Sequence, residues 1–118
     1  MDIRILRAGE SISRAELQTI AAERFGDLVK ADVDVETGAI VLGTEMHADA
    51  EVELIEKQRS AREHIWGINL YPAEQGEDFI EFDSMINIKP AQGNRSRDIE
   101  HAEVREKIIS IINALVIE

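Results

Sequence analysis

Three basic side chains lie close together late in the sequence, and their chemistry suits the binding of an anion. Residues 84–97 contain Lys89, Arg95 and Arg97 and no acidic residue. Arginine donates paired hydrogen bonds to carboxylates and phosphates, and neighbouring amide and hydroxyl side chains add further donors. We therefore expect a small anionic ligand, or a carboxylate of a partner protein, to bind at a loop that contains Asn94, Arg95, Ser96 and Arg97.

The same arginines have an alternative role inside the protein. Arg95 and Arg97 could form ion pairs with acids such as Glu81 or Asp83, because acidic residues outnumber basic ones in this sequence. The sequence leaves both roles open.

His47 is the second candidate for chemistry. His47 or Asp83 could act as the base of a small hydrolase or nuclease-like enzyme in which Arg95 steadies developing negative charge. If the chain is extended here, His47, Asp49 and Glu51 could place three metal ligands on one side, whereas a helix would bring together only His47 and Glu51. No second histidine lies nearby, so we predict neither a metal nor another cofactor.

A long strand is expected to position the basic loop. Residues 79–89 alternate between two faces without interruption, which is typical of a half-buried strand. Pro90 cannot donate a hydrogen bond to a sheet, so the strand ends before it. Residues 65–71 predict a second strand, and the short connection favours an antiparallel pair.

The expected register of this pair creates a polar hollow on one face. It places Asn69 beside Glu81, Gly67 beside Asp83, Leu70 opposite Ile80, Ile68 opposite Phe82 and Trp66 opposite Ser84. The missing side chain of Gly67 leaves room between Asn69 and Asn87, so both asparagines join the candidate ligand site. An ordinary hydrophilic outer surface is the alternative.

The remaining elements complete an α+β fold. Ser13 and Glu16 have capping-box spacing, which predicts a helix over 13–25, and apolar spacing predicts a second helix over 98–116, capped by Ser96 or Asp98. We expect one mixed or mainly antiparallel sheet of about six strands, with both helices packed on one face. Further strands are predicted at residues 3–6, 29–35, 39–42 and 52–54, a short helix being the alternative at the last.

Asp32 and Asp34 share one face of the strand predicted at 29–35. A carboxylate pair can bind a metal or transfer protons. Ordinary strand patterning instead favours two solvated acids on an outer face, and we adopt that interpretation.

Composition limits the class of protein. The 118 residues predict a single domain over residues 1–118. Cysteine is absent, no apolar run reaches membrane-spanning length, and the first residues lack an export signal. We therefore expect a cytoplasmic protein without membrane contact.

The formal net charge is −11, from 13 lysines and arginines and 24 aspartates and glutamates. Such a protein repels phosphate backbones, so we do not expect nucleic acid as a partner. Residues 45–56 and 74–83 contain acids and no basic side chain except histidine. These runs support a third possible function, an acidic interaction protein of the inhibitor or antitoxin type that binds a basic partner.

Four segments carry a resemblance to a known family of small bacterial and archaeal proteins catalogued as a domain of unknown function. They are VDVETG at residues 33–38, GTEMHADAE at 43–51, WGINLYP at 66–72 and above all FDSMINIKPAQGNRSR at 82–97. The resemblance covers nearly the whole chain and implies a complete domain. It implies no activity and assigns no role to any residue.

Overall fold

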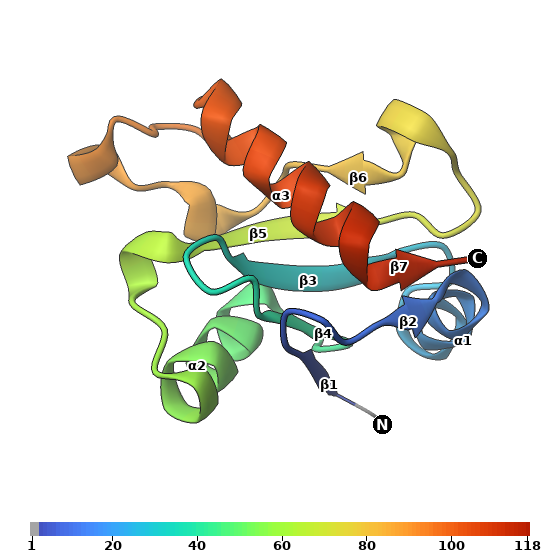
Figure 1. Cartoon of the computed structure of the whole chain (residues 1–118). Coiled ribbons are helices and arrows are strands. Elements are labelled where there is room, and N and C mark those ends of the chain that lie inside the picture. The colour runs from blue at the N-terminus through green and yellow to red at the C-terminus, as the bar shows by residue number, and fades with distance from the viewer. Residues whose placement is uncertain (1–2) are drawn as a thin grey trace.

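The sheet is built around a hairpin of the two strands that the sequence predicts at residues 29–35 and 39–42. The computed structural model describes residues 3–118, and in it β3 (Val29–Asp34) and β4 (Ile40–Leu42) pair antiparallel. β5 (Ile65–Leu70) pairs with β3 along its whole length. All pairs in this sheet are antiparallel, and its strand order is β1 (Arg4–Leu6), β4, β3, β5, β6 (Ile80–Glu81) (Figure 1). The expected α+β class is confirmed.

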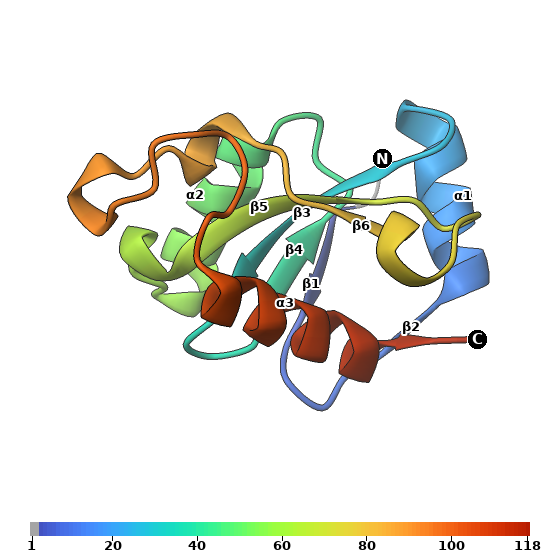
Figure 2. The same ribbon diagram turned by 90° about the horizontal axis from the view of Figure 1, so that it is seen from above.

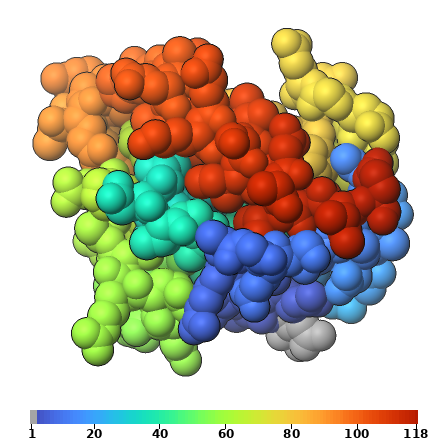
Figure 3. Space-filling model, in the orientation of Figure 1, coloured from blue at the N-terminus to red at the C-terminus, as the bar shows by residue number. Residues whose placement is uncertain are grey.

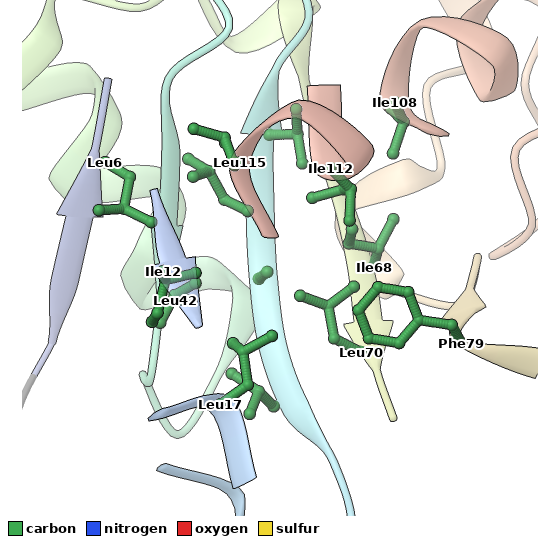
Figure 4. Close-up of a cluster of buried hydrophobic side chains, with 14 of the residues drawn as sticks. Leu6, Ile12, Leu17, Leu42, Ile68, Leu70, Phe79, Ile108, Ile112 and Leu115 are labelled. Carbon is green, nitrogen blue, oxygen red and sulfur yellow. The ribbon is translucent and has the colours of Figure 1, made fainter. Parts of the chain in front are cut away.

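One face of the sheet carries the larger core. Val29, Ala31 and Val33 alternate along β3 and belong to this cluster. The buried residues of α1 (Arg14–Arg24) and α3 (Ala102–Leu115) join the same cluster, part of which is drawn in Figure 4. Those helix residues are Leu17, Ile20, Ala21, Ile108, Ile112 and Leu115.

The other face is covered by a third helix, where the sequence predicts a strand. Strands of the sheet lie between α3 on one side and α2 (His47–Gln58) on the other (Figure 2). The prediction of a strand at residues 52–54 is therefore wrong, and the helix given as its alternative is correct. The buried positions of α2 have helical spacing, but two of them are the polar residues His47 and Glu51. The sequence therefore shows no continuous apolar face for this helix. The apolar cluster on this face contains Ala39, Val41, Ala50, Leu54 and Ile65.

The long strand predicted at 79–89 is also wrong, because only β6 forms. Beyond β6 the chain leaves the sheet and makes short 3-10 turns at Met85–Asn87 and Pro90–Gln92. The Ser84 hydroxyl accepts a hydrogen bond from the Ile86 amide and starts the first turn. This segment and the loop after it form a corner of the surface beside the start of α3 (Figure 3, orange).

The register predicted for β5 and β6 holds only where β6 exists. The pairs Asn69 with Glu81 and Leu70 with Ile80 are confirmed. Further along, Ser84 lies against Gly67: a Cβ built on Gly67 would lie 2.6 Å from the Ser84 Cβ. The predictions that Asp83 faces Gly67 and that Ser84 faces Trp66 are therefore wrong.

The predicted start of the first helix is confirmed and that of the last is not. Ser13 caps α1, and Glu16 completes the capping box. The last helix, α3, begins at Ala102 after His101 rather than at Asp98, so it does not follow the basic loop directly. A small parallel pair, β2 (Ile12–Ser13) with β7 (Val116–Ile117), joins the segments next to α1 and α3.

The helices are short relative to a lipid bilayer. Among residues 3–118, none combines the length and the apolar character that a membrane crossing requires.

Candidate functional site

A polar hollow of about 190 Å³ opens at the α2 face of the sheet. Strand alternation brings the side chains of Lys30 and Asn69 to this face, α2 begins at its edge, and the segment after β6 closes it. The hollow contains four of the residues that the sequence proposed for chemistry, namely His47, Asn69, Asp83 and Arg97. Its full lining is Lys30, Met46, His47, Ala48, Asn69, Asp83, Ser84, Met85, Ile86 and Arg97.

His47 is a neutral hydrogen-bonding group in this setting. Its Nε2 lies 2.8 Å from the carbonyl oxygen of Ile68, and because a carbonyl only accepts, Nε2 carries the hydrogen. In the neutral ring Nδ1 is then an acceptor. Burial lowers the pKa of His47, an effect that the Ile68 carbonyl opposes by favouring the protonated form.

Asn69 contains the least satisfied atom of the hollow. Its side-chain nitrogen donates to Glu81 Oε1 at 2.8 Å and to the carbonyl oxygen of Asp83 at 3.3 Å. Its oxygen, Oδ1, is buried and has no hydrogen-bond partner among the described residues. A buried acceptor without a donor costs about 1–3 kcal/mol, so such atoms are rare in folded proteins.

Arg97 and Asp83 form an ion pair at the rim of the hollow. The Nε of Arg97 lies 2.7 Å from Asp83 Oδ1, and the two side chains are 56% and 43% exposed. The ion pair with an internal acid, which the sequence allowed for Arg97, is therefore formed. Exposed pairs of this kind contribute up to about 1 kcal/mol, so Arg97 can exchange Asp83 for another carboxylate at little cost.

The amino terminus of α2 supplies backbone donors that the sequence did not indicate. Met46 occupies the N-cap without a side-chain hydrogen bond, and His47 and Ala48 line the hollow in the first turn. First-turn amides lack partners within a helix, and the helix dipole places partial positive charge there. Lys30 adds a full positive charge, with its ammonium 5.0 Å from the centre of the Phe25 ring.

The loop at Asn94–Arg97 uses most of its donors internally. The amides of Arg95 and Ser96 donate to Glu100 Oε2 at 2.9 and 3.0 Å, and the Ser96 hydroxyl donates to the same oxygen. These bonds lower the pKa of Glu100, the Arg95 amide having the largest effect. The loop thus accommodates a carboxylate that the chain itself provides.

Asn94 and Asn87 hold this region together from inside. The Asn94 side chain donates to the carbonyl oxygens of Asn87, Ser96 and Asp98 and accepts from the amide of Glu100. Asn87 accepts from the amide of Gly67 and donates to its carbonyl, in the manner of a neighbouring strand. It also donates to the carbonyl of Arg97, which fixes the backbone of that residue beside the hollow.

The proposed metal ligands do not come together. In the helix, Asp49 is exposed and Glu51 forms an ion pair with Arg62, Oε1 to Nε, at 3.2 Å. Residues 3–118 contain no group of three His, Cys, Asp or Glu side chains that could hold a metal ion. Of the three groups of the enzyme hypothesis, His47 and Asp83 line the hollow but Arg95 does not.

The prediction that Asp32 and Asp34 are solvated acids on an outer face is wrong. Both are buried beneath α2 and its connections. Asp34 accepts from the amides of Glu36 and Thr37 and from the Ser60 hydroxyl. Both carboxyl oxygens of Asp32 lack a partner in the described chain, and burial, followed by the nearby Glu51 carboxylate, raises the pKa of Asp32 well above its ordinary value.

Comparison with known proteins places the chain in a family. The family described as "protein of unknown function (DUF5674)" matches residues 5–115. The chain belongs to this family. The resemblance of its sequence to a domain of unknown function is thereby confirmed. No curated protein and no solved structure matches the chain.

Proposed function

We propose that this DUF5674 protein is a binding module for a small anionic ligand, held in the polar hollow. The observation that carries the proposal is the convergence of Lys30, Arg97 and the first turn of α2 on one hollow. A hollow with a few convergent polar and charged groups is the usual setting of a small-ligand site.

The charges around the hollow support an anion. Lys30, Arg97 and the amino terminus of α2 are positive or carry partial positive charge, and all line the same space. Asp83 is the opposing charge, and Arg97 already neutralises it. In a protein with a net charge of −11, this is a local environment that favours a carboxylate.

The proposal moves the site away from the tip of the basic loop. Arg97 and Asn69 remain as ligand contacts, whereas Asn87 and Asn94 support the backbone that positions Arg97. Arg95 and Ser96 remain alternatives, although their amides already bind Glu100.

The test is a titration of ¹⁵N-labelled protein with sodium propionate at pH 7, with sodium chloride at equal ionic strength as the blank. We expect shifts for the His47 and Ala48 amides and the Asn69 side-chain amide. Arg97→Ala should raise the dissociation constant about tenfold, because this is the usual effect of losing one charge-assisted hydrogen bond.

Two further variants sharpen the test. Arg97→Ala also leaves Asp83 unpaired, so Lys30→Met serves as an independent loss of positive charge that keeps an apolar stem near Phe25. Arg95→Ala is the matched control, because Arg95 lies in the same loop outside the hollow. Binding that Arg95→Ala abolishes and Arg97→Ala spares would return the site to the loop, and absence of binding to the wild type would reject the proposal.

A further inference from the structure

We infer that the groove between β6 and α3 binds a small amphipathic carboxylate, a molecule with an apolar body and one anionic end. The groove lies on the α3 side of the sheet, opposite the polar hollow, so binding there is independent of the proposed function. Its volume is about 790 Å³, and small-molecule sites usually measure about 300–1,000 Å³. In Figure 3 it is the hollow between the yellow segment around residue 76 and the red helix.

Apolar side chains line the groove from both sides. Phe79, Ile80 and Phe82 come from the segment around β6, and Ile109 comes from α3. Ile80 and Phe82 are half-buried against the larger core, and Ile109 is 39% exposed. An apolar molecule between these walls would remove further apolar surface from water, which favours binding.

Arg105 provides a positive charge on the helix side of the groove. Arg105, Ile109 and Asn113 are four residues apart in α3, and all three line the groove. Residues with this spacing share one face of a helix. The guanidinium of Arg105 is therefore carried on the same helix face as the apolar side chain of Ile109.

Arg105 also lacks the partner that comparable arginines have. Among residues 3–118, the half-buried arginines are Arg4, Arg14, Arg24 and Arg105. The first three each pair with a glutamate, whereas Arg105 has no ion-pair partner in this part of the chain. Acidic residues number 24 in this protein, so a half-buried guanidinium without one is unusual here. A carboxylate from outside would gain a charge-assisted hydrogen bond at this position.

The other charged groups of the lining leave this role to Arg105. The Arg14 guanidinium already donates to two backbone carbonyl oxygens and pairs with Glu118. Glu77 and Glu106 are exposed, so water and salt screen their charges. The ligand carboxylate thus binds at Arg105, and its apolar body lies between α3 and the segment around β6.

The experiment compares hexanoate, hexan-1-ol and propionate in titrations of the ¹⁵N-labelled full chain at pH 7 and constant ionic strength. Hexan-1-ol has the apolar body without the charge, and propionate has the charge with a shorter body. Dissociation constants come from the amide shifts of residues 102–113 and of Gly76. We expect hexanoate to bind at least about tenfold more tightly than hexan-1-ol, because it gains a charge-assisted hydrogen bond. It should also bind at least about tenfold more tightly than propionate, because it buries additional methylene groups.

Variants of the groove test each half of the ligand separately. Arg105→Met removes the charge and keeps an apolar stem, and it should reduce the preference for hexanoate over hexan-1-ol to less than about threefold. Unchanged binding of hexan-1-ol to this variant would show that the groove is intact. Arg105→Lys keeps the charge and should retain the preference. Ile109→Asn should weaken both compounds, and Arg95→Met, an exposed arginine outside the groove, is the control that should change neither.

The outcomes separate this groove from the polar hollow. Equal binding of hexanoate and hexan-1-ol, or a preference that survives in Arg105→Met, would overturn the inference. If hexanoate shifts the His47 and Ala48 amides and none in α3, it binds only in the hollow, so the inference fails while the proposed function stands. If the α3 amides shift with protein concentration alone, the groove is an interface between two copies, and the inference is again wrong. Shifts in α3 without any at His47 would support the inference and count against the proposed function.

Discussion

Replacing Asn87 by alanine should strongly destabilise the protein, because this one side chain acts as a strand partner for β5. Its oxygen lies 2.8 Å from the Gly67 amide, and its nitrogen lies 2.9 Å from the Gly67 carbonyl oxygen and 3.0 Å from that of Arg97. Asn87 is fully buried. Alanine would therefore leave the amide and the carbonyl of Gly67 without partners in the protein interior.

The size of the effect follows from the number of groups left unpaired. Each buried group without a partner costs about 1–3 kcal/mol, so the two groups of Gly67, with the cavity, predict a loss of about 3–5 kcal/mol. The Arg97 carbonyl is near solvent and adds less. Domains of this size have total stabilities of about 5–15 kcal/mol, so a large fraction of the stability depends on Asn87.

Urea unfolding followed by Trp66 fluorescence measures this loss. Trp66 is the single tryptophan, is buried, and precedes Gly67 in β5. With a urea slope of about 1.5 kcal/mol/M, the midpoint should fall by about 2–3 M. Asn113→Ala, at an exposed position of α3, is the control and should leave the midpoint unchanged or slightly higher. A loss below about 1 kcal/mol for Asn87→Ala would refute the assignment of Asn87 as a strand partner.

Two further predictions concern neighbouring positions on the same face of the sheet. Gly67→Ala should destabilise the protein by about 1–3 kcal/mol, because the new Cβ would meet Ser84 Cβ and Oγ at 2.6 Å. In the Gly67→Ala background, Ser84→Gly should recover part of that loss in urea unfolding, and purely additive effects would contradict the contact. Asp32→Asn should gain stability relative to the wild type as the pH rises. The native Asp32 pKa lies above its ordinary 3.8, so the native wild type holds its proton more tightly than the unfolded chain and loses stability from about pH 4 upward until the native pKa is passed. Unfolding curves at pH 4, 5.5 and 7 measure this gain, which cannot exceed about 1.4 kcal/mol per pH unit, and a difference independent of pH would exclude a raised pKa.

Local patterns were sufficient to predict the elements that follow local rules. The hairpin of β3 and β4 combines apolar strands with a glycine-containing turn, and the start of α1 depends on the capping box of Ser13 and Glu16. These interactions lie within a few residues of one another, so the sequence alone indicates them.

The errors occur where side chains distant in sequence determine the backbone. Residues 82–89 alternate like a strand, yet Asn87 and Asn94 bind backbone groups of other segments and hold the chain in turns. In α2, the inward positions of His47 and Glu51 were unexpected because polar residues seldom occupy buried positions.

The candidate site was predictable only in part, because some of its contacts follow from nearby residues and others depend on distant elements. Asn69 was placed correctly because its pairing with Glu81 follows from the short connection between β5 and β6. Arg97 was proposed as a ligand residue and Asp83 as a base, with an internal ion pair as the alternative, and the pair is present. Lys30 and the amino terminus of α2 were missed, since their contribution depends on a helix that the alternation of residues 52–54 concealed.

The pairing of β2 with β7 sets an order on the assembly of a newly synthesised chain. Ile12 pairs with Val116, more than 100 residues later, and is buried in the finished protein. A nascent chain can form α1, the β3–β4 hairpin and β5 while it is still being translated, but Ile12 cannot pair with β7 until residue 116 has emerged from the ribosome. The contact between β2 and β7 is thus among the last to form during synthesis.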